Sequence, residues 1–261
     1  DYNGDEWPEK TKINFVNFVK SGGGVVLYHA ADNSFPDWKE YNEIIGLGGW
    51  KNRNEDWGPY VYIKNGEVVR DSTPGRAGGH GAQREYIVEA FKPGHPVLKG
   101  LPAKWRHARD ELYAHLRGPA KNMEILAYAR SKKTGRNEPV LMTITYGKGR
   151  IFHSVLGHSG KRGPFPALEC AGFITTLQRG AEWAATGKVE QKAPHAFPTE
   201  DHSLRWAFYE DIHSDFTPIA RRMQNYQTGK SYDCFNILKI LMRENMNNPN
   251  KINIFHEHTL Q

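Results

Sequence analysis

The chain has 261 residues, of which 38% are hydrophobic and 12% aromatic, so it can bury one large core and a small appendage. No run approaches the roughly 18 consecutive apolar residues of a membrane-spanning helix, and the charged first seven residues lack the pattern of a signal peptide. The formal net charge is +6, but the lysines and arginines are scattered singly or in pairs. These features argue against membrane and nucleic-acid partners, because a nucleic-acid site needs a basic stripe with stacking aromatic residues.

The two cysteines, Cys170 and Cys234, lie far apart in the sequence and form no C-x-x-C pair. Their positions indicate neither a disulfide framework nor a zinc ribbon, and they do not locate the compartment. We therefore expect a soluble protein, and its cysteines do not indicate whether its compartment is oxidising or reducing.

The first elements of the chain follow a helix, turn and strand pattern. Apolar residues at helical spacing between positions 13 and 19 predict a helix that ends at the glycines of residues 22–24. Residues 25–28 then form a short apolar run that ends at His29, as in a parallel strand covered by helices on both faces. This is half of a βαβ unit, so we expect one or two further βα units before residue 1.

A long excursion from the sheet is predicted next. Residues 37–45 suit a short helix, and residues 46–79 are rich in Gly, Asn and Trp. Within them, two runs of β-formers flank Asn65-Gly66, which is a strong hairpin signal. Because loops of this length usually cover or line a site, we expect the excursion to lie over one.

The remaining sequence predicts strands and then helices. The expected strands are residues 86–88, 123–129, 139–146 and 150–156, and a helix is expected over residues 167–184. After Pro194 the sequence becomes coil, and two further helices are predicted at 215–226 and 231–245, joined at Gly229. We therefore expect a main domain over residues 1–206 and a helical extension over residues 207–261. The extension is too small to fold alone, so it should dock on the sheet domain or form a homo-oligomer.

Four segments in chain order carry a resemblance to a known family: GGGVVLYHAAD followed by Asp37-Trp38, HPVLKGLP, DELY, and YGKGRIFH followed by LGH. Together with GAEWAATG at residues 180–187, they resemble the ThuA-like, or trehalose-utilisation, family over about residues 1–206. The resemblance implies a flavodoxin-like parallel sheet flanked by helices, as in class I glutamine amidotransferases. It also implies a bacterial protein of the cytoplasm or periplasm that helps to use trehalose or related disaccharides.

The superfamily places a glutaminase cysteine on the turn after a strand, with a catalytic histidine after a later strand. Here the first turn carries His29 and no cysteine, so we do not expect an active glutamine amidotransferase. His158 follows a predicted strand and Gly157, at the place of the superfamily's histidine. Both should lie at the carboxyl edge of the sheet, where open α/β sheets bind ligands, and we predict both as catalytic.

Further candidates surround these histidines. Asp110 and Glu111 are the expected carboxylate source for acid or base catalysis, and only one can face the pocket if the segment is extended; we favour Glu111. The expected substrate-binding residues are Asp32, His80, Trp38 and Tyr113. Asp32 also suits ordinary turn chemistry, and the tryptophans of the excursion suit a small satellite core as well as sugar stacking.

Histidines near carboxylates also permit zinc or another divalent metal, although no pair has the spacing that puts two ligands on one helix face. The expected ligand is a small sugar, and two functions remain in competition. One is a sugar-modifying enzyme that abstracts a proton beside a carbonyl or hydrolyses its substrate, and the other is a non-catalytic carbohydrate-binding or regulatory module.

Overall fold

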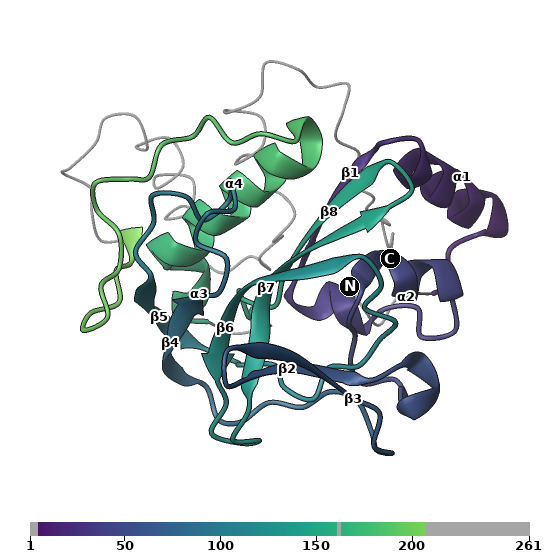
Figure 1. The fold of residues 1–261 in the computed structure, drawn as a ribbon, viewed down its shortest axis with the longest axis horizontal. Helices are drawn as coiled ribbons and strands as arrows, with labels where there is room; N and C mark the ends of the chain where they lie inside the picture. Colours follow the sequence, from purple (N-terminus) through teal and green to yellow (C-terminus); the bar gives the residue numbers. More distant parts are fainter. Residues whose placement is uncertain (1–4, 161–162, 207–261) are drawn as a thin grey trace.

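The computed structural model describes residues 5–160 and 163–206 (Figure 1). Its helices and strands in chain order are α1 (Glu9–Lys20), β1 (Gly24–Tyr28), the 3-10 helix η1 (His29–Asn33), α2 (Lys39–Ile45), the 3-10 helix η2 (Glu55–Trp57), β2 (Tyr60–Lys64), β3 (Glu67–Asp71), β4 (Arg84–Ala90), β5 (Lys104–Asp110), β6 (Met123–Arg130), β7 (Asn137–Tyr146), β8 (Gly149–Ser154), α3 (Pro166–Glu169) and α4 (Ala171–Thr186).

One mixed, curled sheet contains all eight strands. The main strand order is β1-β8-β7-β6-β4-β5, and β2 joins β3 to the edge of β7. β1 and β8 pair in parallel, whereas the other pairs are antiparallel. The predicted flavodoxin-like parallel sheet is therefore wrong. A parallel pair needs a long crossover, usually a helix, but no helix separates β4 from β8, and a tight turn at residues 147 and 148 joins β7 to β8.

Helices cover both faces of the sheet around β8. Alternate residues of β8 point to opposite faces, as strand geometry requires. Phe152 lies against Gly180 of α4, and His153 on the other face contacts the carbonyl oxygen of Ile45 at the end of α2 through Nδ1, at 2.9 Å. Figure 1 shows α4 and α2 on opposite sides of β8. The predicted α/β arrangement of helices on both sides of a sheet is thus confirmed, although most of the strands are antiparallel.

Several local predictions are confirmed by the structure. The first helix ends directly before the glycines, and the strand that follows ends at Tyr28. The β2–β3 hairpin turns at Asn65 and Gly66, whose φ angles of 53° and 77° are those of a tight hairpin turn with two left-handed residues. The helix expected over residues 167–184 is instead two helices, since Cys170 has an extended backbone between α3 and α4.

The predicted helices at 215–226 and 231–245, with the whole extension over residues 207–261, lie outside the described residues. Of the helices in residues 5–160 and 163–206, none combines the length and the apolar character that a bilayer crossing requires.

Candidate functional site

Two histidines meet where the parallel strands end. β1 and β8 run side by side in register, with Tyr28 opposite Ser154, so the residues that follow them emerge at the same edge of the sheet. His29 follows β1 directly, and His158 lies a few residues after β8. Their ring centroids are 5.2 Å apart. The predicted proximity of the two side chains is confirmed, while their catalytic role stays a prediction.

His29 is the first residue of η1, directly after β1, and its backbone is strained. Its φ of 46° lies in the left-handed region, which costs a residue with a side chain roughly 1–2 kcal/mol. Such outliers persist where surrounding contacts impose them, often at functional sites. The guanidinium of Arg53 provides part of that support, because it donates to the carbonyl oxygens of Asn33 and Ser34 at the end of η1, at 3.2 and 2.6 Å. His29 thus stands at a sharp turn from strand to 3-10 helix.

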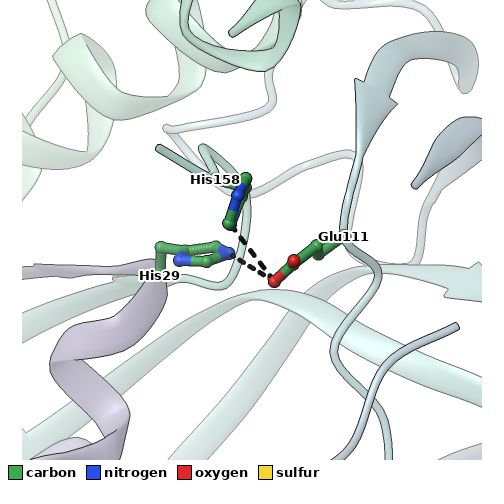
Figure 2. A group of neighbouring side chains, drawn as sticks. All are labelled: His29, Glu111 and His158. Atoms are coloured by element: carbon green, nitrogen blue, oxygen red, sulfur yellow. Dashed lines mark ion pairs between the residues drawn. The ribbon is translucent and has the colours of Figure 1, made fainter. Parts of the chain in front are cut away.

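Glu111 brings a carboxylate to both histidines. Its Oε2 lies 3.2 Å from Nδ1 of His158 and 3.8 Å from Nε2 of His29 (Figure 2). Glu111 follows β5, which stands at the opposite end of the strand order from β1. The two ends of the order meet because the sheet curls. We call His29, Glu111 and His158 the His–Glu cluster.

Two further predicted residues border the His–Glu cluster. Nε2 of His80 lies 3.7 Å from Oε1 of Glu111, and Nδ1 of His80 donates to the carbonyl oxygen of Gly81 at 2.9 Å. The hydroxyl of Tyr113 lies 3.2 Å from Nδ1 of His29. The ring of Trp50, from the glycine-rich excursion, lies 4.6 Å from that of Tyr113. The excursion therefore contributes an aromatic wall beside the cluster, as expected of a loop over a site.

Asp110 does not share the position of Glu111. Its carboxylate is buried and accepts hydrogen bonds from Nε2 of His107 and from the backbone N–H groups of Glu111, Gly157 and His158, at 2.8 to 3.0 Å. Of the two adjacent acids, Glu111 is the one whose carboxylate contacts His29 and His158. Asp110 instead fixes the backbone that carries Glu111 and His158. Sequence reasoning missed this positioning role and its partner His107, because nothing in the sequence reveals which backbone groups the carboxylate meets.

Two predicted substrate-binding residues lie away from the His–Glu cluster. The carboxylate of Asp32 is fully buried and faces Nε2 of His153 at 3.6 Å. Trp38 is buried in the main hydrophobic core, where it packs with the rings of Trp7, Phe15, Phe35 and Tyr41. The structure therefore does not support a ligand-binding role for either residue, and the core interpretation of Trp38 fits its packing.

The three groups of the cluster have different proton affinities. Burial lowers the pKa of His29 from 6.5 to about 4, so its imidazole is neutral near pH 7. The adjacent carboxylate of Glu111 raises the pKa of His158 above its ordinary value. Burial alone would raise the pKa of Glu111, but the neighbouring imidazoles, His158 first, hold it below its ordinary range. Separated proton affinities of this kind suit a site that binds or moves protons.

The fold and the cluster define a mixed-sheet α/β protein with a histidine–carboxylate site where its two parallel strands end. The family model ThuA, described as trehalose utilisation, matches residues 1–184, so the chain belongs to the ThuA family. A solved structure described as a putative ThuA-like protein from Parabacteroides merdae is 54% identical, with a TM-score of 0.76 over 78% of this chain and 75% of that one. Another, from Bacteroides uniformis, is 18% identical, with a TM-score of 0.44 over 72% and 69% of the two chains. A comparison with curated proteins finds no match.

Proposed function

We propose that the protein binds and chemically alters a sugar of the trehalose type, or an oxidised keto derivative of one, at the His–Glu cluster. The observation that carries the proposal is the convergence of two imidazoles and one carboxylate at the end of the parallel strands. Membership of a trehalose-utilisation family supports the choice of a sugar as substrate.

The surroundings of the cluster suit a sugar. Trp50 is partly exposed and offers an aromatic face, and such faces stack on the apolar faces of pyranose rings. His80 and Glu111 add polar groups that can hydrogen-bond hydroxyls, and the side chain of His80 is 39% exposed. A partly apolar wall with a few convergent polar groups is the usual form of a small-molecule site.

The groups of the cluster suit two reaction types, namely proton abstraction beside a carbonyl and hydrolysis. In the first, the carbon–hydrogen electron pair becomes a carbon–carbon double bond, and the carbonyl oxygen takes up a proton. Both reactions need one group that accepts a proton and another that donates one, and positioned side chains typically contribute about 10²- to 10⁴-fold to such transfers.

The test is turnover of trehalose, sucrose and their keto derivatives by the pure protein, with and without a chelator. Hydrolysis releases monosaccharide, and proton abstraction exchanges a carbon-bound hydrogen for deuterium in heavy water, which NMR detects. Glu111→Gln should abolish either signal, whereas Glu67→Gln at the exposed start of β3 should not. A protein that binds these sugars without hydrolysis or exchange would be a binding module, and the catalytic proposal would fall.

A further inference from the structure

We propose that His29, Glu111 and His158 form a binding site for a divalent transition-metal ion of the zinc class. One possible ligand atom from each residue lies within 4.8 Å of the others. Around a single zinc ion, with bonds of about 2.0–2.2 Å, ligand atoms are separated by about 3–4 Å. The contacts of Glu111 Oε2, at 3.2 Å to His158 and 3.8 Å to His29, fall in this range.

The nitrogens that face the centre of the cluster are buried and have no hydrogen-bond partner among the described residues. These atoms are Nε2 of His29 and Nδ1 of His158, and the side chain of His29 is only 7% exposed. The nearest carboxylate oxygen is too far from His29, and poorly aligned with His158, for a hydrogen bond. Buried polar atoms are nearly always satisfied, so two unpaired nitrogens beside one carboxylate indicate a missing ligand.

The outer contacts orient these groups as second-shell partners orient metal ligands. The hydroxyl of Tyr113 contacts Nδ1 of His29, which leaves Nε2 for the ion. The carboxylate of Asp110 accepts the backbone N–H groups of both Glu111 and His158, so one buried anion fixes two of the three ligands. Metal-binding histidines are typically oriented by a partner at the second ring nitrogen, as Tyr113 is placed to do for His29.

The donor set also selects the kind of ion. Two imidazoles and one carboxylate suit zinc and its first-row neighbours, whereas magnesium and calcium prefer oxygen donors. Three protein ligands leave a coordination position for a substrate oxygen or water, as in catalytic zinc sites. With the ion bound, His29 and His158 serve as ligands, and the nearby imidazole available for proton transfer is that of His80, whose Nε2 faces Oε1 of Glu111.

The inference deepens the proposed function, but metal binding can be measured without any sugar. The full chain, free of an affinity tag and dialysed against EDTA, is titrated with zinc chloride in a calorimeter. We expect one zinc ion per chain at this site, no competition from magnesium, and a cobalt(II) spectrum with imidazole and carboxylate ligation. Glu111→Gln and His158→Ala should weaken zinc binding by more than about 100-fold, because even second-shell changes cost about 10- to 100-fold. His202→Ala, at an exposed histidine after α4, should leave affinity unchanged.

Thermal melting of each variant separates loss of the site from loss of the fold. The inference is overturned if the folded wild-type chain binds no zinc, or if Glu111→Gln binds it as tightly as His202→Ala. Zinc binding without turnover of any sugar would leave the metal site standing and reject the proposed reaction. Turnover by a protein that binds no zinc on titration would reject the metal site and leave the proposed function standing.

Discussion

Oδ1 of Asp110 accepts the backbone N–H of His158 at 3.0 Å, and this bond ties the end of β5 to the loop after β8. Burial alone would raise the pKa of Asp110, but His107 and the backbone N–H groups hold it below its ordinary range. The carboxylate therefore stays charged near neutral pH inside the protein. It joins the two ends of the strand order at the His–Glu cluster.

Asp110→Asn should destabilise the domain by about 3 kcal/mol, because hydrogen bonds to a buried charged acceptor contribute about 1.5–3 kcal/mol each and an amide cannot accept all of them. The free energy of unfolding in urea measures the effect, and Asp201→Asn at an exposed position is the control. Zinc affinity should also fall by about 10-fold or more, since the variant loosens two ligands. Equal stability of the two variants would contradict the positioning role.

His95 should make stability sensitive to acid. Its Nδ1 accepts the backbone N–H of Val97 at 3.2 Å, which a protonated ring cannot do, and burial lowers the pKa of His95 below 6.5. Its contribution to stability is therefore fully present above pH 6.5 and is lost as the pH falls through the lowered folded-state pKa.

His95→Asn should remove this dependence, because the amide oxygen accepts the same hydrogen bond without titrating. The free energy of unfolding of the wild type should fall relative to that of the variant as the pH is lowered from about 7 to about 5. His195→Asn, at an exposed histidine, controls for the loss of an imidazole. A difference that stays constant with pH would show that the Val97 contact does not matter.

Gly180→Ala should destabilise the protein although alanine favours helices. A Cβ at this buried position of α4 would overlap the ring of Phe152 on β8. Overpacking of this kind costs about 1–3 kcal/mol, more than the gain of up to about 1 kcal/mol in helix propensity. Gly94→Ala is the matched control, because nothing lies within 4 Å of the new Cβ. Urea denaturation should separate the two variants, and a stabilised Gly180→Ala would refute the close packing.

The strained backbone of His29 can be tested without reference to activity. Asparagine tolerates the left-handed region better than alanine, so His29→Asn should be more stable than His29→Ala by about 1 kcal/mol. The same pair of substitutions at His202, which has no positive φ, should differ little. If the two His29 variants unfold at the same urea concentration, the φ of 46° carries no energetic cost.

Local elements of this fold can be predicted from the sequence because their signals are local. The glycines after α1 and the Asn65-Gly66 turn each fix a backbone conformation at a few residues. Strand direction is different, because it depends on how strands are connected and paired. The apolar runs of β7 and β8 do not show strand direction, and the short link between them allows only an antiparallel pair, so the fold expected from the resemblance was wrong about most of the sheet. β5, which lies at the end of the strand order, was not among the predicted strands; its residues were considered only as a possible extended segment.

The candidate site shows the same limit. His29 and His158 could be placed together because each follows a strand and both strands end at one edge. The choice between Asp110 and Glu111 depends on the curl that brings the end of β5 to that edge, which no local pattern encodes. Asp32 has the residue type of a ligand-binding group, but it lies in the interior, and its burial raises its pKa.

The pairing of β1 with β8 has a consequence for synthesis on the ribosome. Gly24 pairs with Arg150, and among the described strands β8 is the one that β1 pairs with. The pairing of β1 with β8 therefore cannot form until most of the domain has been translated. Contacts so distant in sequence slow folding, and the edge of β1 that pairs with β8 stays unpaired meanwhile. The emerging chain should need a chaperone most between the synthesis of β1 and that of β8.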